Sequence, residues 1–299
     1  MDRFYLMSVF VAVAEAESFA KAGRHLGMSP PAVTRAISAL EDRLGVRLLT
    51  RTTRMVRLTE AGARYLDDSR RIMAEMDEAD ESATGISATP RGQLHVTAPA
   101  LFGRIFITPV ILEYLDRHPE VNVNALFLDR IVNLVEEGVD IAIRIGELPD
   151  SSLRAARVGT VRQVVVAAPS YLQQHGIPQH PMDLKSHRIV AAMGITASPD
   201  WKFYANGKPV SVRVAPRMTV TTNESAIEAV RGGWGVTRLL SYQVAPHLKQ
   251  GELKTVLSEF EPPALPVHVV HLDGRRPTAK VRAFVDLLVE RLRADLALN

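Results

Sequence analysis

The stretch SPPAVTRAISALEDRLGVRLLTR, residues 29–51, carries a helix signal followed by a series of arginines. Ser29 is expected to cap a helix. Pro30 and Pro31 fit the first helical turn, where the missing backbone N–H of proline costs nothing. Apolar residues then recur at helical spacing, and the expected buried stripe is Val33, Ile37, Leu40 and Leu44, with Gly45 ending the helix. The stretch therefore predicts one short amphipathic helix with a fixed start and a fixed end.

Two further helices are expected upstream. The apolar residues of the first helix lie at i, i+3, i+4 and i+7, on one face: Leu6, Val9, Phe10 and Val13. Ser18 is expected to cap the second helix, FAKAGRHL, and Gly27 to close it. Two short helices joined by a tight turn with glycine form a helix-turn-helix, whose second helix lies in the major groove of DNA. The first 45 residues therefore predict a DNA-binding unit.

Arginines and threonines continue after this unit. The sequence VRLLTRTTRMVRLT alternates roughly between apolar residues and Arg or Thr, which is typical of a two-stranded wing. Five arginines lie between positions 43 and 57, and no acidic residue stands between Asp42 and Glu60. Such a cationic block indicates a phosphate-bearing partner, although an ordinary solvated hairpin is the alternative.

The residues off the buried stripe and at the wing are the expected DNA contacts. Arg35 is the strongest candidate for base readout, because its guanidinium can bond guanine O6 and N7 together. Arginines at the tip of the wing could enter a minor groove. The predicted DNA-facing set is Ser29, Pro30, Pro31, Thr34, Arg35, Ser38, Arg51 and Arg54.

Length and composition limit the number of domains and the classes of protein to which the chain can belong. A chain of 299 residues allows two domains, or three if one is small. It contains no cysteine, which excludes disulfides and thiol nucleophiles, and no apolar run approaches the roughly 20 residues that span a bilayer. The segment Leu6 to Ala16 follows Met-Asp-Arg, which has no net side-chain charge, so a signal peptide is not expected. We therefore expect a cytoplasmic protein.

A long helix is expected from Thr59, its N-cap. A heptad spacing of 4,3,4,3 links residues that could form a weak coiled-coil seam: Tyr65, Ser69, Ile72, Met76, Ala79, Ala83 and Ile86. The alternative is a helix that packs on its own domain. The segment TGISATPRGQ, residues 84–93, is a break rich in Gly, Ser, Thr and Pro that leads into the second half.

The second half alternates strand-like and helical segments. LHVTA, VNVNALF, VDIAIRIG, RQVVVAA, RIVAA and MTVTT read as strands, and RIFITPVILEYLDRH, IVNLVEEG and ESAIEAVRGG read as helices. This alternation predicts βαβ units with a largely parallel sheet. Ligands of such folds bind beyond the carboxyl ends of the strands.

Both halves resemble one family, the LysR-type transcriptional regulators. The spacing LE..LG..L..R....LT.AG is met by Leu40, Glu41, Leu44, Gly45, Leu48, Arg51, Leu58, Thr59, Ala61 and Gly62. The segments TAPALFGR, HPEVNVNALFLDR, LVEEGVDIAIRIGELPDSSL and AIEAVRGGWGV resemble the effector-binding domain of that family. Departures include Leu49, where the family often has Phe, and Trp234 and Arg238, where it often has a glycine-rich turn that leads to Pro.

The resemblance implies an α/β chain with three parts. These are a winged helix-turn-helix over 1–58, a dimerising linker helix over 59–88, and an effector-binding domain over 89–299 built from two Rossmann-like subdomains, as in periplasmic solute-binding proteins. It also implies a dimer or tetramer, a double-stranded DNA operator with an inverted repeat, a small-molecule effector, and contact with RNA polymerase.

On the same resemblance, the cleft between the subdomains would take its lining from several strand ends: Thr97, Pro99, Ala100, Leu128, Asp129, Arg144 and Ile145 from the first subdomain or a crossing strand, and Met193 to Thr196, Thr222 and Asn223 from the second. Thr97 and Asn223 end strands just before helices, where backbone N–H groups can hold an anion. Arg144 could bind a carboxylate of the effector bidentately, or form a structural ion pair with Glu137 or Asp140.

The sequence contains few features of an enzyme or a metal-binding protein. The sequence has no G-x-S-x-G, G-x-G-x-x-G or P-loop motif. His268 and His271 point to opposite faces of an expected strand, and His175, His180 and His187 lie in a proline-interrupted loop, so no metal site is predicted. We expect no cofactor and no enzymatic activity. A solute-binding protein or a two-subdomain α/β enzyme remains the alternative.

Overall fold

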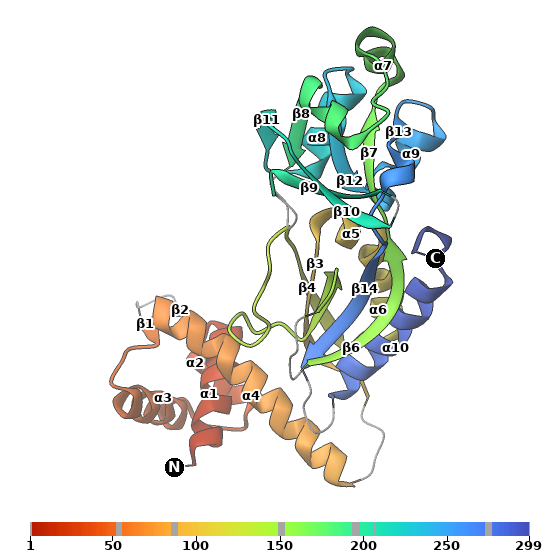
Figure 1. Cartoon of the computed structure of the whole chain (residues 1–299). Coiled ribbons are helices and arrows are strands. Elements are labelled where there is room, and N and C mark those ends of the chain that lie inside the picture. Colours follow the sequence, from red (N-terminus) through yellow and green to blue (C-terminus); the bar gives the residue numbers. More distant parts are fainter. Residues whose placement is uncertain are drawn as a thin grey trace. The chain divides into compact units, whose positions relative to one another are not determined.

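A computed structural model describes residues 2–51, 56–84, 89–148, 153–192, 198–205, 207–272 and 277–298 (Figure 1). The chain divides into two compact units, Met1–Thr89 and Pro90–Asn299. Within the described residues, no helix is long and apolar enough to cross a membrane.

The first unit contains four helices and a hairpin among its described residues: α1 (Arg3–Ala16), α2 (Phe19–His25), α3 (Pro30–Leu44), β1 (Leu49–Arg51), β2 (Val56–Leu58) and α4 (Glu60–Thr84). One core joins α1, α2, α3 and the start of α4, and it includes Phe10, Val33, Ile37 and Leu40, each fully buried. The expected apolar stripes of the first and third helices are therefore confirmed, with Leu44 only partly buried.

Two of the expected helix caps form and one does not. Lys21 donates its backbone N–H to the hydroxyl of Ser18, and Gly62 donates to the hydroxyl of Thr59 at 2.9 Å. Ser29 occupies the N-cap position of α3, but its side chain makes no cap bond. The prolines explain this difference. Pro31, at the second position of the helix, has no N–H to donate to the Ser29 hydroxyl, and the N–H of the next residue, Ala32, bonds the Ser29 carbonyl at 2.9 Å.

The expected heptad seam of α4 begins inside its own unit. The ring of Tyr65 packs against Phe10 with centroids 5.5 Å apart, and Ser69 is fully buried. Farther along the helix, Ile72 and Met76 are about 40% exposed. The first turns of the seam therefore pack on α1 of their own unit. The side chains of Ala79 and Ala83, and all of Ile86, lie outside the described residues.

The second unit is built on two five-stranded sheets. The first has the order β4-β3-β5-β14-β6, with β3 (Gly92–Ala98), β4 (Val121–Phe127), β5 (Ile141–Ile145), β6 (Leu153–Val161) and β14 (Leu265–Leu272). The second has the order β11-β8-β12-β7-β13, with β7 (Gln163–Ala167), β8 (Ile189–Ala192), β11 (Pro216–Val220), β12 (Val236–Leu240) and β13 (Lys254–Val256). The chain passes between the sheets from β6 to β7 and from β13 to β14.

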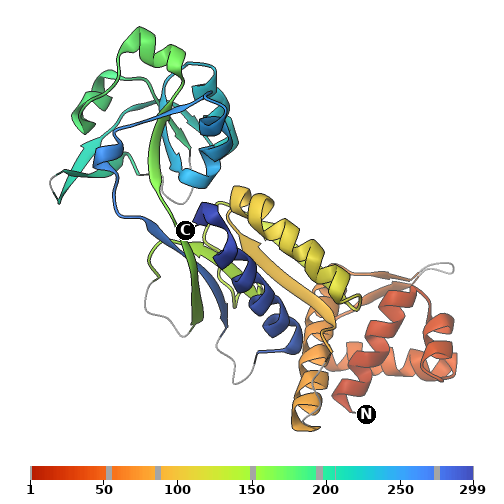
Figure 2. The same cartoon turned by 90° about the vertical axis from the view of Figure 1, so that its right-hand side faces the viewer.

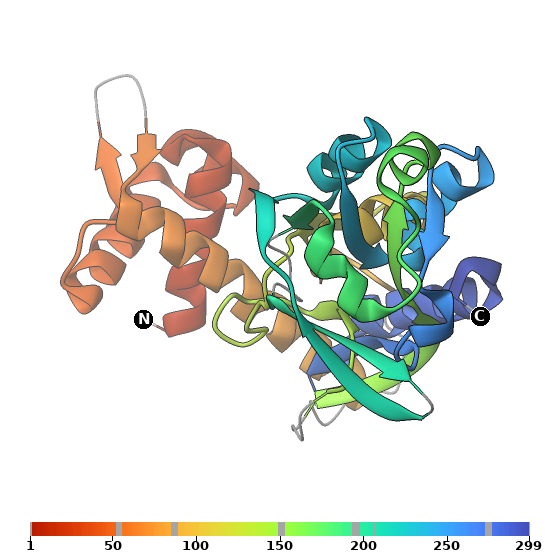
Figure 3. The ribbon, with the colours of Figure 1, turned by 45° about the horizontal axis from the view of Figure 1, so that its top comes forward.

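Helices cover these sheets. They are α5 (Ala100–Phe102), the π-helical turn η1 (Gly103–Ile107), α6 (Thr108–Arg117), α7 (Pro169–His175), α8 (Asn223–Arg231), α9 (Ser241–Lys249) and α10 (Ala279–Ala294), with 3-10 turns at η2 (Pro181–Ser186), η3 (Ser258–Phe260) and η4 (Leu296–Leu298). Figure 2 shows α6 and α10 side by side against the first sheet. A separate hairpin of β9 (Asp200–Ala205) and β10 (Lys208–Arg213) lies on the second subdomain (Figure 3).

Two sequence expectations for this unit need correction. Each sheet is mixed rather than largely parallel, because β14 pairs antiparallel with β5 and β6, and β7 pairs antiparallel with β12 and β13. The segment IVNLVEEG is a turn and not a helix. Val132 and Leu134 are buried there while Ile131 and Val135 are exposed, and the Asn133 side chain accepts from the Val135 N–H, so local bonding favours a turn.

Candidate DNA-binding surface and ligand cleft

The N-terminal half of α3 presents most of the predicted DNA-facing residues. Ser29, Pro30, Pro31 and Arg35 are exposed, and Thr34 and Ser38 are half-buried. Among the described residues, Arg35 makes no hydrogen bond or ion pair, so its guanidinium is available to a ligand. The side chain of Arg51 and the whole of Arg54 lie outside the described residues.

The start of the wing is hydrogen-bonded to a buried carboxylate of α3. Glu41 is only 4% exposed, and its Oε1 accepts from the backbone N–H of Leu48 at 2.8 Å and of Leu49 at 3.1 Å. Its Oε2 pairs with Arg47 Nη1 at 3.3 Å. The carboxylate therefore fixes the start of β1 against the helix that carries Arg35. Sequence reasoning placed Glu41 in a family motif and gave it no role, although an acid beside the apolar stripe was a usable signal.

The far end of the wing returns to the same point. The Thr59 backbone N–H bonds the Leu48 carbonyl at 2.9 Å, and the Thr59 hydroxyl donates to the Arg47 carbonyl at 2.8 Å. Gly62 comes so close to Leu48 that a Cβ added there would lie 1.9 Å from the Leu48 carbonyl oxygen. The hairpin is consequently held at both ends by α3 and α4.

In the second unit, one carboxylate joins the two subdomains. Asp129 follows β4 of the first sheet, and its Oδ1 accepts from the Ala100 N–H, at the start of α5, at 3.0 Å. Its Oδ2 accepts from Asn223 Nδ2, at the start of α8 in the second subdomain, at 3.2 Å. The structure therefore brings together Ala100, Asp129 and Asn223, three of the residues that the resemblance places in the cleft, and the Asp129 carboxylate accepts from the other two.

The other predicted lining residues have local roles in this structure. Thr97 is 3% exposed, and its hydroxyl donates to the Leu126 carbonyl at 2.7 Å. Thr222 caps α8 by accepting from the Ser225 N–H at 3.2 Å. Pro99 is buried and Leu128 is half-buried beside them. Met193 and Thr196 lie outside the described residues.

Arg144 does not lie on a crossing strand. It belongs to β5, which pairs with β3 and β14 inside the first sheet, and Ile145 ends the same strand. Its guanidinium donates to the carbonyl of Val132. Burial lowers the pKa of Arg144, and the nearby charge of Glu137 partly offsets this shift. In this structure Arg144 bonds a backbone carbonyl and Glu137 pairs with another arginine, so the ion pair with Glu137 is not formed, and binding of an effector carboxylate by Arg144 stays a prediction.

Glu137 has a different partner. Arg130 binds it bidentately, with Nη1 to Oε1 at 2.8 Å and Nη2 to Oε2 at 2.6 Å. The hydrogen bond from Arg130 lowers the pKa of Glu137, with a smaller contribution from the Asn133 N–H. The turn over residues 130–137 is stabilised by this pair at its surface.

An aromatic cluster also connects the subdomains, and sequence reasoning missed it. Tyr242 of α9 meets Phe102 and Phe106 with ring centroids 5.3 and 5.6 Å apart. Burial strongly raises the pKa of the Tyr242 hydroxyl, and the charges of Asp129 and Glu224 add to the effect. No spacing in the sequence relates residues so far apart, so the contact required the structure.

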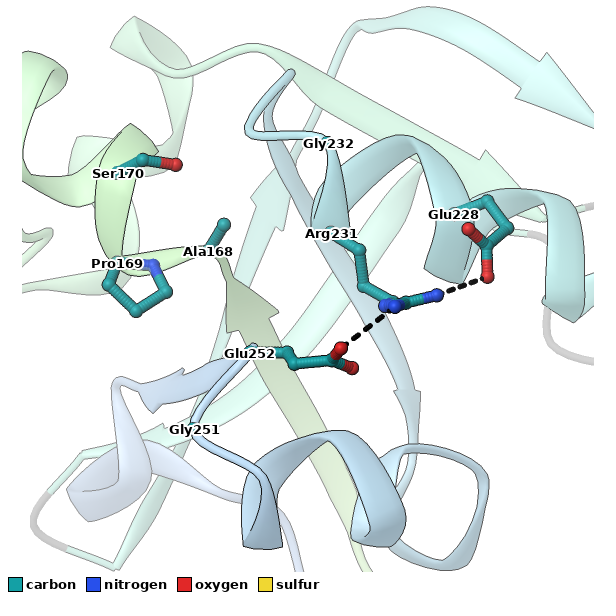
Figure 4. Close-up of a pocket in the computed structure, with 8 residues that line it drawn as sticks. All are labelled: Ala168, Pro169, Ser170, Glu228, Arg231, Gly232, Gly251 and Glu252. Atoms are coloured by element: carbon teal, nitrogen blue, oxygen red, sulfur yellow. Dashed lines mark hydrogen bonds and ion pairs between the residues drawn. The ribbon is translucent and has the colours of Figure 1, made fainter.

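A separate pocket of about 560 Å³ lies in the second subdomain (Figure 4). It is lined by Ala168, Pro169, Ser170, Glu228, Arg231, Gly232, Gly251 and Glu252, and contains none of the predicted cleft residues. Arg231 bonds Glu228 at 2.7 Å and Glu252 at 2.8 Å, and His247 Nδ1 lies 2.7 Å from Glu252. The charged side chains of the pocket are thus paired with one another or with His247, although Arg231 Nε has no hydrogen-bond partner within the described residues. Among the described residues, no cluster of His, Asp and Glu could hold a metal ion.

Comparisons with known proteins cover both units. The family model described as the LysR substrate binding domain matches residues 87–293, and the model for bacterial regulatory helix-turn-helix proteins of the lysR family matches residues 4–63. An HTH-type transcriptional regulator of Xanthomonas campestris pv. campestris is 35% identical over 291 residues, 96% of this chain and 85% of that protein. CrgA, an HTH-type transcriptional regulator of Neisseria meningitidis, is 32% identical over 97% of both chains. The solved structure of CrgA, a LysR-type transcriptional regulator, matches with a TM-score of 0.62 at 31% identity, over 98% of this chain and 99% of CrgA.

Proposed function

Since the chain belongs to the LysR family and is a DNA-binding transcriptional regulator of that type, we propose that it acts as a homo-oligomer on an inverted-repeat operator. Its parts would be a winged helix-turn-helix over 1–58, a dimerising linker helix over 59–88 and an effector-binding domain over 89–299. A single helix-turn-helix reads one half-site, so two copies are needed for an inverted repeat. The exposed Ile72 and Met76 on α4 support a contact between copies.

The observation that carries the DNA-binding proposal is the exposed guanidinium of Arg35 on α3, which has no hydrogen bond or ion pair within the described residues. It is the base-reading residue in the proposal, and Pro31, Thr34 and Ser38 flank it on the same helix. Ser29 and Pro30 begin the helix near the backbone of the DNA. Arg51 and Arg54 of the wing contact phosphates or an adjacent minor groove.

The effector proposal rests on the contact between Asp129 and Asn223. In this structure the Asp129 carboxylate accepts from donors of both subdomains. A small molecule with an acceptor group, such as a carboxylate, would compete for the Ala100 N–H and the Asn223 amide. Thr97, Pro99, Leu128, Arg144, Ile145, Met193, Thr196 and Thr222 complete the proposed lining. Binding would shift the balance between two oligomer shapes and so change DNA bending or contact with RNA polymerase.

The relatives are named as transcriptional regulators, and we extend this to a protein without enzymatic activity that works in the cytoplasm. The test is a selection of bound sequences from a random double-stranded DNA pool, followed by measurement of the stoichiometry on the winning site. We expect an inverted repeat bound by an even number of chains. Enrichment of a lone half-site bound by one chain would contradict the proposal.

A further inference from the structure

Arg238 lies on the face of the second sheet that carries the β9–β10 hairpin. It stands opposite Val165 in the pairing of β12 with β7. Val165 and Val236 belong to the apolar cluster that contains Trp201 of the hairpin, whereas Leu239 packs on the other face with residues of α8. The guanidinium carbon of Arg238 is 4.9 Å from the centroid of the Trp201 ring. Arg238 therefore lies between the sheet and the hairpin.

Among the residues that the structure describes, this guanidinium has no anionic partner. Within the part of the chain that the structure describes, Arg238 has the contact with Trp201 and no hydrogen bond or ion pair. By contrast, Arg231 of the same subdomain bonds two carboxylates, and Arg162 pairs with Glu261 at 2.7 Å. Burial lowers the pKa of Arg238 to about 10, with no compensating charge. A cation in such a site is costly unless an anion binds it.

We propose that Arg238 anchors a small organic carboxylate beneath the β9–β10 hairpin, at a site separate from the Asp129–Asn223 cleft. No hydrogen bond or ion pair within the described residues uses the N–H groups of this guanidinium, so they are left for bidentate binding to a carboxylate. One guanidinium balances the single charge of a carboxylate. The apolar neighbours, Val165 and Trp201, suit a ligand with an apolar body.

The site is distinct from the proposed effector cleft because of the alternation of side chains along β12. Asn223 begins α8, and α8 packs on the face to which Leu239 points. Arg238 points to the opposite face. The inference therefore goes beyond the proposed regulation and does not require DNA or the cleft for its test.

The test uses the two tryptophans of the chain, Trp201 and Trp234. In a Trp234→Phe background of the full-length protein, Trp201 fluorescence is titrated with benzoate, and with benzamide as the neutral isostere. We expect a saturable change with benzoate only. Arg238→Met should weaken benzoate binding about ten- to hundredfold, the range for loss of a charged hydrogen-bonding partner. Arg162→Met, which removes an exposed and paired guanidinium of the same subdomain, should leave the affinity unchanged.

Thermal melts of the same proteins provide a second readout. Benzoate should raise the melting temperature of the parent and of Arg162→Met, and should leave that of Arg238→Met unchanged. A benzoate response that survives Arg238→Met, or one that Asn223→Ala removes instead, would overturn the proposal. If Arg238→Met does not fold, the parent decides: equal responses to benzoate and benzamide, or no response to benzoate, would also overturn it.

Discussion

The buried carboxylate of Glu41 should control both the stability of the wing and DNA binding. In Glu41→Ala, the N–H groups of Leu48 and Leu49 lose their acceptor in a buried position. Each unsatisfied N–H costs about 1–3 kcal/mol, so the variant should be destabilised by about 2–6 kcal/mol. Glu41→Gln keeps an amide oxygen as acceptor and loses mainly the pair with the exposed Arg47, so its cost should be about 1 kcal/mol.

Urea unfolding separates this effect from the rest of the chain. Both tryptophans, Trp201 and Trp234, lie in the second unit, so their fluorescence reports that unit, and far-UV circular dichroism reports both units. Glu41→Ala should shift the circular dichroism transition and weaken DNA binding, and leave the fluorescence transition in place. Asp42→Ala removes a neighbouring exposed acid and is the control. If Glu41→Ala and Asp42→Ala behave alike in both assays, the assigned role of Glu41 is refuted.

Three further predictions concern other contacts. Arg35→Ala should cost about 1–3 kcal/mol on the selected operator and relax the preference at one base pair, as anisotropy with single-base variants of the site would show; unchanged preference would argue against base readout. Gly62→Ala should destabilise the first unit in the same urea assay, because the new Cβ would meet the Leu48 carbonyl at 1.9 Å; a parent-like transition would show that the backbone relaxes freely. The hydrogen bond from Arg291 lowers the pKa of Glu113 from its ordinary value of 4.5. The pair therefore stabilises the second unit above the ordinary pKa, and this contribution is lost as the pH falls through the lowered pKa. Arg291→Gln should therefore reduce urea stability at pH 7, and the difference should shrink in acid; a constant difference would refute the linkage.

Local chemistry made the first unit predictable from the sequence. The prolines of α3, the Ser18 and Thr59 caps and the apolar stripes each act within one or two helical turns. The exception was Ser29, whose hydroxyl cap failed because proline removes the N–H that it would bind. Glu41 was missed because its partners become neighbours only when the wing folds back on α3.

Contacts between distant segments limited the prediction for the second unit. Asp129, Ala100 and Asn223 meet across two sheets, and only the family resemblance brought them together beforehand. Arg144 was expected on a crossing strand, whereas its strand lies inside the first sheet, and no sequence pattern shows its bond to the Val132 carbonyl. The mixed sheets have the same cause, since β14 returns from the far end of the chain.

Sequence-specific DNA binding by the full-length protein can be measured in one titration. Fluorescence anisotropy of the full-length protein would be measured on the DNA flanking its own coding region and on a scrambled duplex, at two salt concentrations. We expect binding to the flanking DNA at least about a thousandfold tighter than to the scrambled duplex. Equal binding to both duplexes, weakened equally by added salt, would refute sequence-specific recognition. The arginine block would then be a general binding site for polyanions.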